Sequence, residues 1–230
     1  NQALQSVFIR GFRSPINIFI DSYGTIWFGS WDVLVKYDPK TKTSDLIRDF
    51  PSAIVYSFFE DSDHNLWIGS AAGLVRYSLE TGKLDVFKND PDNSQSLSNN
   101  VVFHVMKDNA GTMWIGTGGG LNKMIRGTEN GIPKFVHWRT TQSGLPNDDV
   151  YCIVDGEDAT LWLTCGNYVT HFFPNDNSFR NYDHNDGLSM GNFRGANYLS
   201  GKGHKTSSGH ILFGSSDGLV VFHPDSLEDN

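Results

Sequence analysis

Basic residues are scarce in this chain of 230 residues, which has 18 Lys and Arg against 26 Asp and Glu and a net charge of −8. An acidic surface repels nucleic-acid phosphates and anionic lipid head groups, so we expect neither nucleic-acid binding nor direct membrane contact. No run of about 18 apolar residues is present, and the sequence therefore predicts no membrane span. The N-terminus carries no basic or apolar leader and no initiator Met, so we expect the chain to be part of a longer protein.

Cysteine is also scarce. Cys152 and Cys165 flank one predicted hairpin turn, where they either face each other across neighbouring strands or remain free. Disulfides between adjacent strands are strained and uncommon, which favours free, buried thiols. The eight histidines are scattered without the spacing of metal ligands, so neither a metal nor another cofactor is predicted.

Helical periodicity is nearly absent, and the chain repeats a different pattern instead. Tryptophan recurs in four similar segments, TIWFGS, NLWIGS, TMWIGT and TLWLTC, and HILFGSS places a leucine at the same position. The spacings between these positions are 40, 47, 48 and 50 residues. A period of this length indicates a solenoid or a propeller. The five positions are Trp27, Trp67, Trp114, Trp162 and Leu212.

Each repeat contains short runs rich in β-branched and aromatic residues, separated by turn residues, as in INIFID, TIWFGS and LVKYD of the first repeat. Four meandering strands in about 45 residues are typical of a propeller blade. We therefore predict an all-β fold, a β-propeller with five four-stranded blades. The blades are expected at about residues 12–50, 51–97, 98–145, 146–190 and 191–225.

The tryptophans are expected to fill the contacts between neighbouring blades, because a single four-stranded sheet cannot bury both of its apolar faces. Asp21, Asp61 and Asp108 each stand six residues before their tryptophan. In the fourth repeat we interpret Asp155 as the equivalent residue, with one extra residue between it and Trp162.

Closure of the ring has two possible forms. The fifth repeat offers three strands, and residues 5–10 could supply its fourth strand and close a five-bladed ring between the chain ends. Alternatively, the five blades are part of a larger propeller. The sequence does not separate these two forms.

The pattern D-x-x-G-x-(L/I/M)-W-(I/F)-G-(S/T), followed by G-L and an aromatic strand, resembles the two-component regulator propeller repeat. DSDHNLWIGSAAGLVRYSLETG, residues 61–82, and DNAGTMWIGTGGGLNKM, residues 108–124, are close matches. The resemblance implies a periplasmic sensor region of a membrane-bound hybrid histidine kinase, with a homodimer formed through the full-length protein. Such propellers usually have seven blades, which favours a partial ring unless this relative is itself five-bladed.

Function in propellers generally lies on loops at one end of the channel. The loops leading into the first strands and those joining the second and third strands are expected to share one face. Trp31 stands out there, and an aromatic ring near Arg, Asp and Asn suits a sugar, although Trp31 could instead pack on a neighbouring blade or domain. We predict an oligosaccharide-binding face that includes Arg13, Trp31, Asp32, Asn100, Asp149, Tyr168, Arg194 and Asp217.

Catalysis is a weaker hypothesis. Glu60, His104 and Asp149 lie on or beside first strands, so an acid–base pair of a lyase or glycosidase at the channel mouth is conceivable, as in propellers similar to streptogramin lyase. Inward polar residues of propellers mostly bind channel water. The sequence thus predicts a ligand sensor with no catalytic residue, and an enzyme or a protein-binding scaffold is the alternative.

Overall fold

The computed structural model describes residues 15–125, 132–188, 192–193 and 203–227, and the predicted strand at residues 5–10 lies outside them. The first blade has the strand order β1-β2-β3-β4 and the second β5-β6-β7-β8. Their bounds are β1 Asn17–Ile20, β2 Ile26–Gly29, β3 Leu34–Asp38, β4 Thr43–Leu46, β5 Val55–Glu60, β6 Asn65–Ser70, β7 Gly73–Ser78 and β8 Leu84–Phe87.

The third and fourth blades repeat this order, and the described part of the fifth blade has three strands, β17-β18-β19. Their bounds are β9 Val102–Lys107, β10 Met113–Thr117, β11 Gly120–Ile125, β12 Lys134–Trp138, β13 Val150–Asp155, β14 Leu161–Cys165, β15 Tyr168–Phe173, β16 Ser178–Tyr182, β17 Gly203–Lys205, β18 Ile211–Ser215 and β19 Gly218–Phe222.

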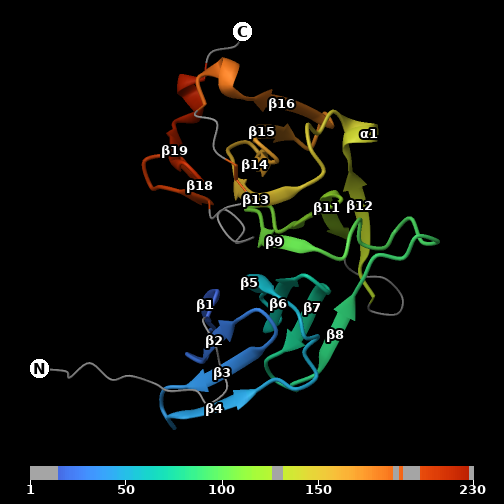
Figure 1. Ribbon diagram of the computed structural model, residues 1–230, viewed down its shortest axis with the longest axis vertical. Coiled ribbons are helices and arrows are strands. Elements are labelled where there is room, and N and C mark those ends of the chain that lie inside the picture. Colours follow the sequence, from blue (N-terminus) through green and yellow to red (C-terminus); the bar gives the residue numbers. More distant parts are fainter. Residues whose placement is uncertain (1–14, 126–131, 189–191, 194–202, 228–230) are drawn as a thin grey trace, which may run out of the picture.

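All strand pairs are antiparallel, and the five blades follow one another about a common axis (Figure 1). The inner strands β1, β5, β9, β13 and β17 make contact in that order. The helix α1 (Thr140–Ser143) has four residues, and no helix in the described part of the chain is long and apolar enough to cross a membrane. The prediction of an all-β propeller with five blades is confirmed.

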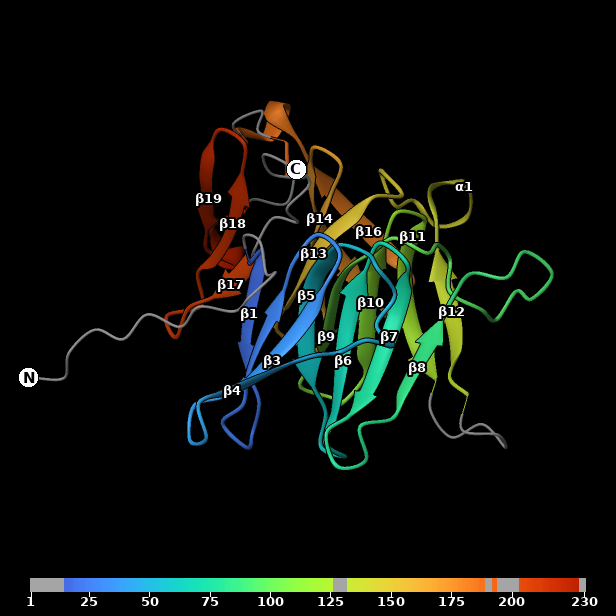
Figure 2. The ribbon, with the colours of Figure 1, turned by 60° about the horizontal axis from the view of Figure 1, so that its bottom comes forward.

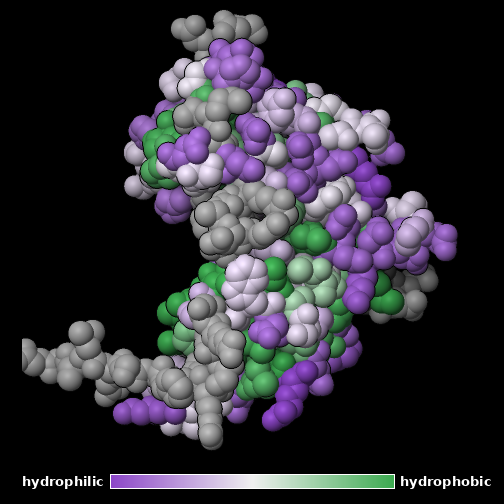
Figure 3. Space-filling view, in the orientation of Figure 1, coloured by the Kyte–Doolittle hydropathy of each residue, from purple (hydrophilic) through white to green (hydrophobic). Residues whose placement is uncertain are grey.

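The two ends of this series carry apolar side chains on their outer faces. Phe19 of β1 stacks on Phe58 of the second blade, so the alternating residues Ile18 and Ile20, 61% and 63% exposed, face away from it. In β19, Leu219 and Val221 are exposed in the same way. Figure 3 shows apolar surface over β19 and over the first two blades, and Figure 2 shows β1 and β17–β19 as neighbouring ends of the series. The first and fifth blades therefore do not bury these side chains against each other.

A β-bulge near the start of the inner strand is repeated in the three middle blades. In each case the pairing register skips one residue, and that residue is aromatic: Tyr56, Phe103 or Tyr151. The three rings contact one another edge to face from blade to blade, with centroids 5.4 and 5.0 Å apart. All three are at least 95% buried, so this level of the inner strands is closed by aromatic packing.

The glycine two residues after the tryptophan allows the next blade to approach. A Cβ atom on Gly69 would lie 2.8 Å from the carbonyl oxygen of Val102, and one on Gly116 would lie 2.5 Å from that of Val150. Both contacts are shorter than packing tolerates. The motif W-(I/F)-G is therefore explained by close contact between consecutive blades.

In the first three blades each tryptophan is held by an aspartate, and we call this contact the Asp–Trp pair. The indole Nε1 donates to Asp Oδ2 at 2.7–2.8 Å, while Asp Oδ1 accepts the backbone N–H four residues along the turn. One carboxylate thus fixes both the β-turn and the large side chain. The pairs are Asp21–Trp27, Asp61–Trp67 and Asp108–Trp114.

The fourth blade lacks this Asp–Trp pair, and the sequence analysis assigned the wrong residue to the aspartate position. Asp155 pairs with Leu161 in the register, as Glu60 pairs with Leu66, so Asp155 is equivalent to Glu60. The residue six positions before Trp162 is Gly156, whose N–H donates to the Thr160 carbonyl at 2.9 Å, as that of Asp108 donates to Thr112. The expected extra residue is wrong: the turn keeps its length, and glycine replaces the aspartate.

Candidate functional site

The two sets of loops predicted to share a face do lie together. Backbone hydrogen bonds connect Val55 to Ser30, Gly118 to Val101 and Gly166 to Asp149, at 3.0–3.1 Å. The predicted binding residues are nevertheless spread around this face: Trp31 and Asp32 belong to the first blade, Asn100 to the third, Asp149 and Tyr168 to the fourth, and Asp217 to the fifth. Arg13 and Arg194 lie outside the described residues.

Several of these candidates have structural partners on the loop face. Asn100 Oδ1 accepts the N–H of Asn89 at 2.8 Å and holds the long loop after β8. Asp149 Oδ2 accepts the hydroxyl of Tyr151 at 3.1 Å. Trp31 is 45% exposed, with Asp32 exposed beside it. Among the six candidates that the structure describes, no hydrogen bond joins one to another, and their role in binding a ligand stays a prediction.

The three residues considered for acid–base chemistry are engaged separately. Glu60 accepts both the N–H and the hydroxyl of Ser22, between the first and second blades. His104 Nδ1 accepts the N–H of Ile153, between the third and fourth blades, and Asp149 is bound to Tyr151 as described above. The geometry therefore gives no acid–base pair among Glu60, His104 and Asp149.

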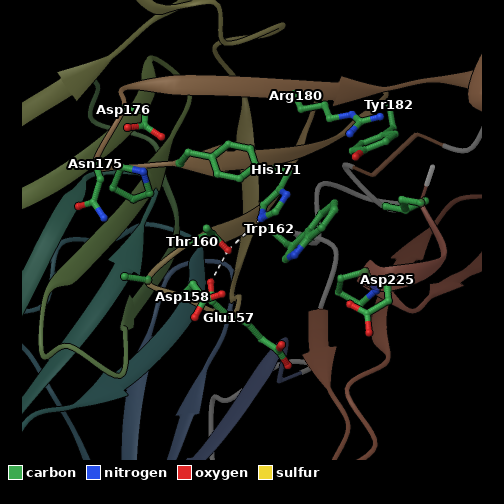
Figure 4. Close-up of a pocket in the computed structure, with 15 residues that line it drawn as sticks. Glu157, Asp158, Thr160, Trp162, His171, Asn175, Asp176, Arg180, Tyr182 and Asp225 are labelled. Carbon is green, nitrogen blue, oxygen red and sulfur yellow. Dashed lines mark hydrogen bonds between the residues drawn. The ribbon is translucent and has the colours of Figure 1, made fainter. Parts of the chain in front are cut away.

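A pocket lies between the fourth and fifth blades, at the end of the strands opposite the loop face, with a volume of about 410 Å³. Figure 4 shows its lining side chains converging from the fourth blade and from the 3₁₀ turn Pro224–Ser226 that follows β19. The turns β13–β14 and β15–β16 form its rim. The polar and aromatic lining residues are Glu157, Asp158, Thr160, Trp162, His171, Phe173, Asn175, Asp176, Arg180, Tyr182 and Asp225.

Trp162 and His171 form the wall of this pocket. Their rings stack with centroids 4.0 Å apart and an angle of 10° between the planes. Burial, helped by the nearby Arg180 guanidinium, lowers the pKa of His171 to about 4, so the imidazole is neutral at physiological pH. The Thr160 hydroxyl donates to the Glu157 carbonyl at 2.7 Å and lies 2.9 Å from His171 Nε2. Nε2 is therefore the protonated nitrogen, and Nδ1 is an acceptor.

The charges of the side chains along this row differ from those of the second blade. There, Trp67 is paired with Arg76, and Arg76 forms a salt bridge of 2.6 Å with Asp85. The register places His171 at the position of Arg76 and Arg180 at the position of Asp85. The row Asp–Trp–Arg–Asp of the second blade thus becomes Gly–Trp–His–Arg in the fourth.

Acidic side chains predominate around the rim. Glu157 lies 3.4 Å from Lys205 Nζ, and Asp225 lies 3.6 Å from His223 Nδ1. Asp158, Asp176 and Asp225 are exposed residues that line the pocket. Arg180 stacks over the ring of Tyr182 at 5.3 Å. The pocket combines several hydrogen-bond acceptors with aromatic side chains and one guanidinium, a mixture that suits a polyhydroxylated ligand.

Sequence reasoning missed this pocket, although the repeats contain a signal for it. Aligning the repeats on their tryptophans shows Gly156 where the first three have Asp, and His171 where they have Lys or Arg. Counting from Asp155 concealed both departures. No feature of the sequence indicates that the turn Pro224–Ser226 also lines this pocket.

Comparisons with known proteins agree with the repeat pattern. Two segments, residues 49–72 and 96–119, match the profile of the family described as "Two component regulator propeller". They include the inner two strands of the second and third blades. The protein is thus a β-propeller, and two of its segments match the model of the two-component regulator propeller repeat. A search of curated proteins found no match.

Similar solved structures include the extracellular domain of a hybrid two-component system of B. thetaiotaomicron, with 21% identity and a TM-score of 0.75 over 92% of this chain and 28% of that chain. PorZ of Porphyromonas gingivalis has 15% identity and a TM-score of 0.64 over 91% and 33%. Virginiamycin B lyase of Staphylococcus aureus has 15% identity and a TM-score of 0.63 over 90% and 64%. At these identities the likenesses establish the fold alone. The chain spans less than a third of the first of these proteins.

Proposed function

We propose that this chain is the ligand-sensing propeller of the extracytoplasmic, periplasmic region of a membrane-bound bacterial signalling protein, and that it binds an oligosaccharide and signals to a histidine kinase. The family repeats support the sensor role. The observation that carries the proposal is the pocket between the fourth and fifth blades, where Trp162, Arg180 and several carboxylates converge.

The pocket also offers a route for a signal. Its lining joins the fourth blade to the turn Pro224–Ser226, which follows β19. A ligand that contacts both elements stabilises the arrangement in which they lie together, and it shifts the population toward that arrangement by its difference in affinity. In the full-length protein, this shift would change packing against a neighbouring domain or a second subunit.

Thermal-shift measurements on the purified chain with an oligosaccharide panel test the proposal, because a ligand that binds only the folded state raises the melting temperature. Arg180→Ala in the pocket is compared with Trp31→Ala on the loop face. We expect at least one sugar to stabilise the unaltered chain and Arg180→Ala, but not Trp31→Ala, to remove that effect. Loss of the effect in Trp31→Ala alone would place binding on the loop face, and no stabilisation by any sugar would overturn glycan sensing.

A second experiment concerns signalling. In the full-length protein, the sugar found by the thermal-shift screen is expected to change histidine autophosphorylation, and Arg180→Ala is expected to abolish that response. A full-length protein whose kinase activity ignores the bound sugar would contradict the sensor role.

A further inference from the structure

The indole N–H of Trp162 differs from those of the three preceding blades. Trp27, Trp67 and Trp114 each donate to an aspartate of their own turn. The Trp162 residue is just as buried, with 2% of its surface exposed, yet its Nε1 has no acceptor among the described residues and is not one of the fully buried polar atoms, so it is open to the pocket. An indole N–H is a donor only, and one that opens into a pocket can donate to water or to a ligand there.

The absence of the acceptor comes from glycine at position 156. The Thr160 hydroxyl occupies the space beside it, 2.3 Å from where a Cβ atom would lie. This hydroxyl is oriented toward the Glu157 carbonyl and His171 Nε2, so it does not replace the aspartate as an acceptor for Trp162. The fourth blade therefore lacks the internal Asp–Trp hydrogen bond, and its tryptophan forms part of the wall of the pocket instead. In Figure 4 the indole nitrogen of Trp162 lies on the edge of the ring turned toward Glu157.

We infer that Trp162 recognises the ligand of this pocket: its indole N–H donates a hydrogen bond to an oxygen of a sugar unit that carries no carboxylate or sulfate group. This inference rests on the function proposed above and deepens it. The ligand oxygen takes the role that the aspartate carboxylate has in the other blades. Trp162 is thus a specificity-determining residue, whereas its counterparts are structural.

The charges around Trp162 support an uncharged ligand. Four carboxylates line the pocket, and the cations near them are Arg180 and Lys205, with Lys205 already beside Glu157. The neutral His171 adds no positive charge. A carboxylated or sulfated sugar would be repelled by this rim, whereas hydroxyl groups can donate to the carboxylates of Asp158, Asp176 and Asp225.

The test is Trp162→Phe, which keeps a ring against His171 and removes the N–H. Trp114→Phe is the matched control, because it makes the same change where the N–H is already bound by Asp108. Binding is measured by calorimetry with uncharged trisaccharides (maltotriose, cellotriose and mannotriose) and with acidic sugars (trigalacturonic acid and a heparin disaccharide).

We expect Trp162→Phe to weaken binding of the uncharged sugar about fivefold to tenfold, the value of one hydrogen bond, and Trp114→Phe to leave it unchanged. Trp114→Phe should instead lower the melting temperature more, since it leaves Asp108 without its partner. Unchanged affinity in Trp162→Phe together with loss of binding in Arg180→Ala would overturn this inference and leave the proposed function intact. Tighter binding of the acidic sugars would overturn the ligand class, and no binding of any sugar would overturn both proposals.

A second measurement shows whether the N–H is unpartnered. In ¹⁵N spectra of the ligand-free protein, the Trp162 indole proton should exchange with solvent faster than those of Trp27, Trp67 and Trp114. On addition of the uncharged sugar, its signal should shift most. Protection of Trp162 equal to that of the other three would contradict the inference.

Discussion

The ring of His171 lies parallel to that of Trp162, with centroids 4.0 Å apart. In the second and third blades the equivalent positions hold Arg76 and Lys123, each a cation above its tryptophan at 5.8 and 5.7 Å. A neutral imidazole can stack more closely than a charged side chain, because it is planar and has no charge that must stay hydrated. Burial lowers the pKa of His171, so the folded chain favours the neutral imidazole, and this gives the fold a pH dependence.

Stability is expected to fall as the pH decreases from about 6.5 to about 4. The pKa of His171 is lowered from 6.5 to about 4 in the folded state. Between these values the unfolded chain binds a proton that the folded chain does not, so protonation favours unfolding over that window, and the effect levels off below it. Urea unfolding of the unaltered chain and of His171→Gln, at a series of pH values, measures the difference.

The control for this pH dependence is His184→Gln, because His184 is an exposed residue. We expect His171→Gln to flatten the pH profile between about 6.5 and 4, and His184→Gln to retain it. Identical slopes for the unaltered chain and His171→Gln would show that the imidazole does not titrate as its surroundings imply.

Removal of an Asp–Trp pair should destabilise the fold by about 3 kcal/mol, because Asp61→Ala leaves the indole N–H of Trp67 and the N–H of Asn65 without an acceptor in a buried place. Asp155→Ala is the matched control. Asp155 is not part of such a pair and accepts one N–H, that of Asn109 at 3.2 Å. Denaturant midpoints should show a clearly smaller loss for Asp155→Ala, and equal losses would contradict the corrected alignment of the fourth repeat.

A methyl group at Gly116 should destabilise the protein by more than about 2 kcal/mol, since a Cβ atom there meets the Val150 carbonyl oxygen of the next blade at 2.5 Å. Gly118, two residues away in the same glycine-rich segment, has its nearest neighbour at 3.4 Å. Thermal unfolding of Gly116→Ala and Gly118→Ala compares the two, and the second should be close to the unaltered chain. A mild effect at Gly116 would show that the blades can separate without cost.

The sequence predicted the blades because strand alternation, turn residues and the tryptophan spacing are all local features. It predicted the burial of Trp27, Trp67, Trp114 and Trp162 for the same reason. It could not predict the pocket, whose walls come from Glu157 through Arg180 and from Asp225, far apart in the chain and joined only by the pairing of blades. The equivalence of Gly156 to Asp108 depends on the strand register. Asp155 lies one residue before Gly156, and because it is an aspartate close to the expected position, the sequence analysis took it for the equivalent of Asp108.

On the loop face, the sequence analysis proposed binding residues that have structural roles in the loops. Trp31 was singled out because the equivalent positions in the other repeats hold small or polar residues, and its side chain is 45% exposed. Asn100 and Asp149 were chosen by residue type, yet both satisfy hydrogen bonds of the loops themselves. Polar residues of loops often serve the backbone around them, and residue type alone does not separate that role from ligand binding.

The two cysteines should be unreactive in the folded protein. Cys152 and Cys165 are both free and fully buried, and burial raises the pKa of the Cys165 thiol far above its usual range. The thiolate is the reactive form, so Ellman's reagent should modify neither residue in native buffer. In about 6 M guanidinium chloride, two thiols per chain should react at once, without a reductant, because unfolding exposes them. In the denatured single variants Cys152→Ala and Cys165→Ala, one thiol per chain should react with the reagent. If the denatured, unreduced chain released none, the two residues would be joined by a disulfide across β13 and β14, and the strand geometry described for the fourth blade would be wrong at that point.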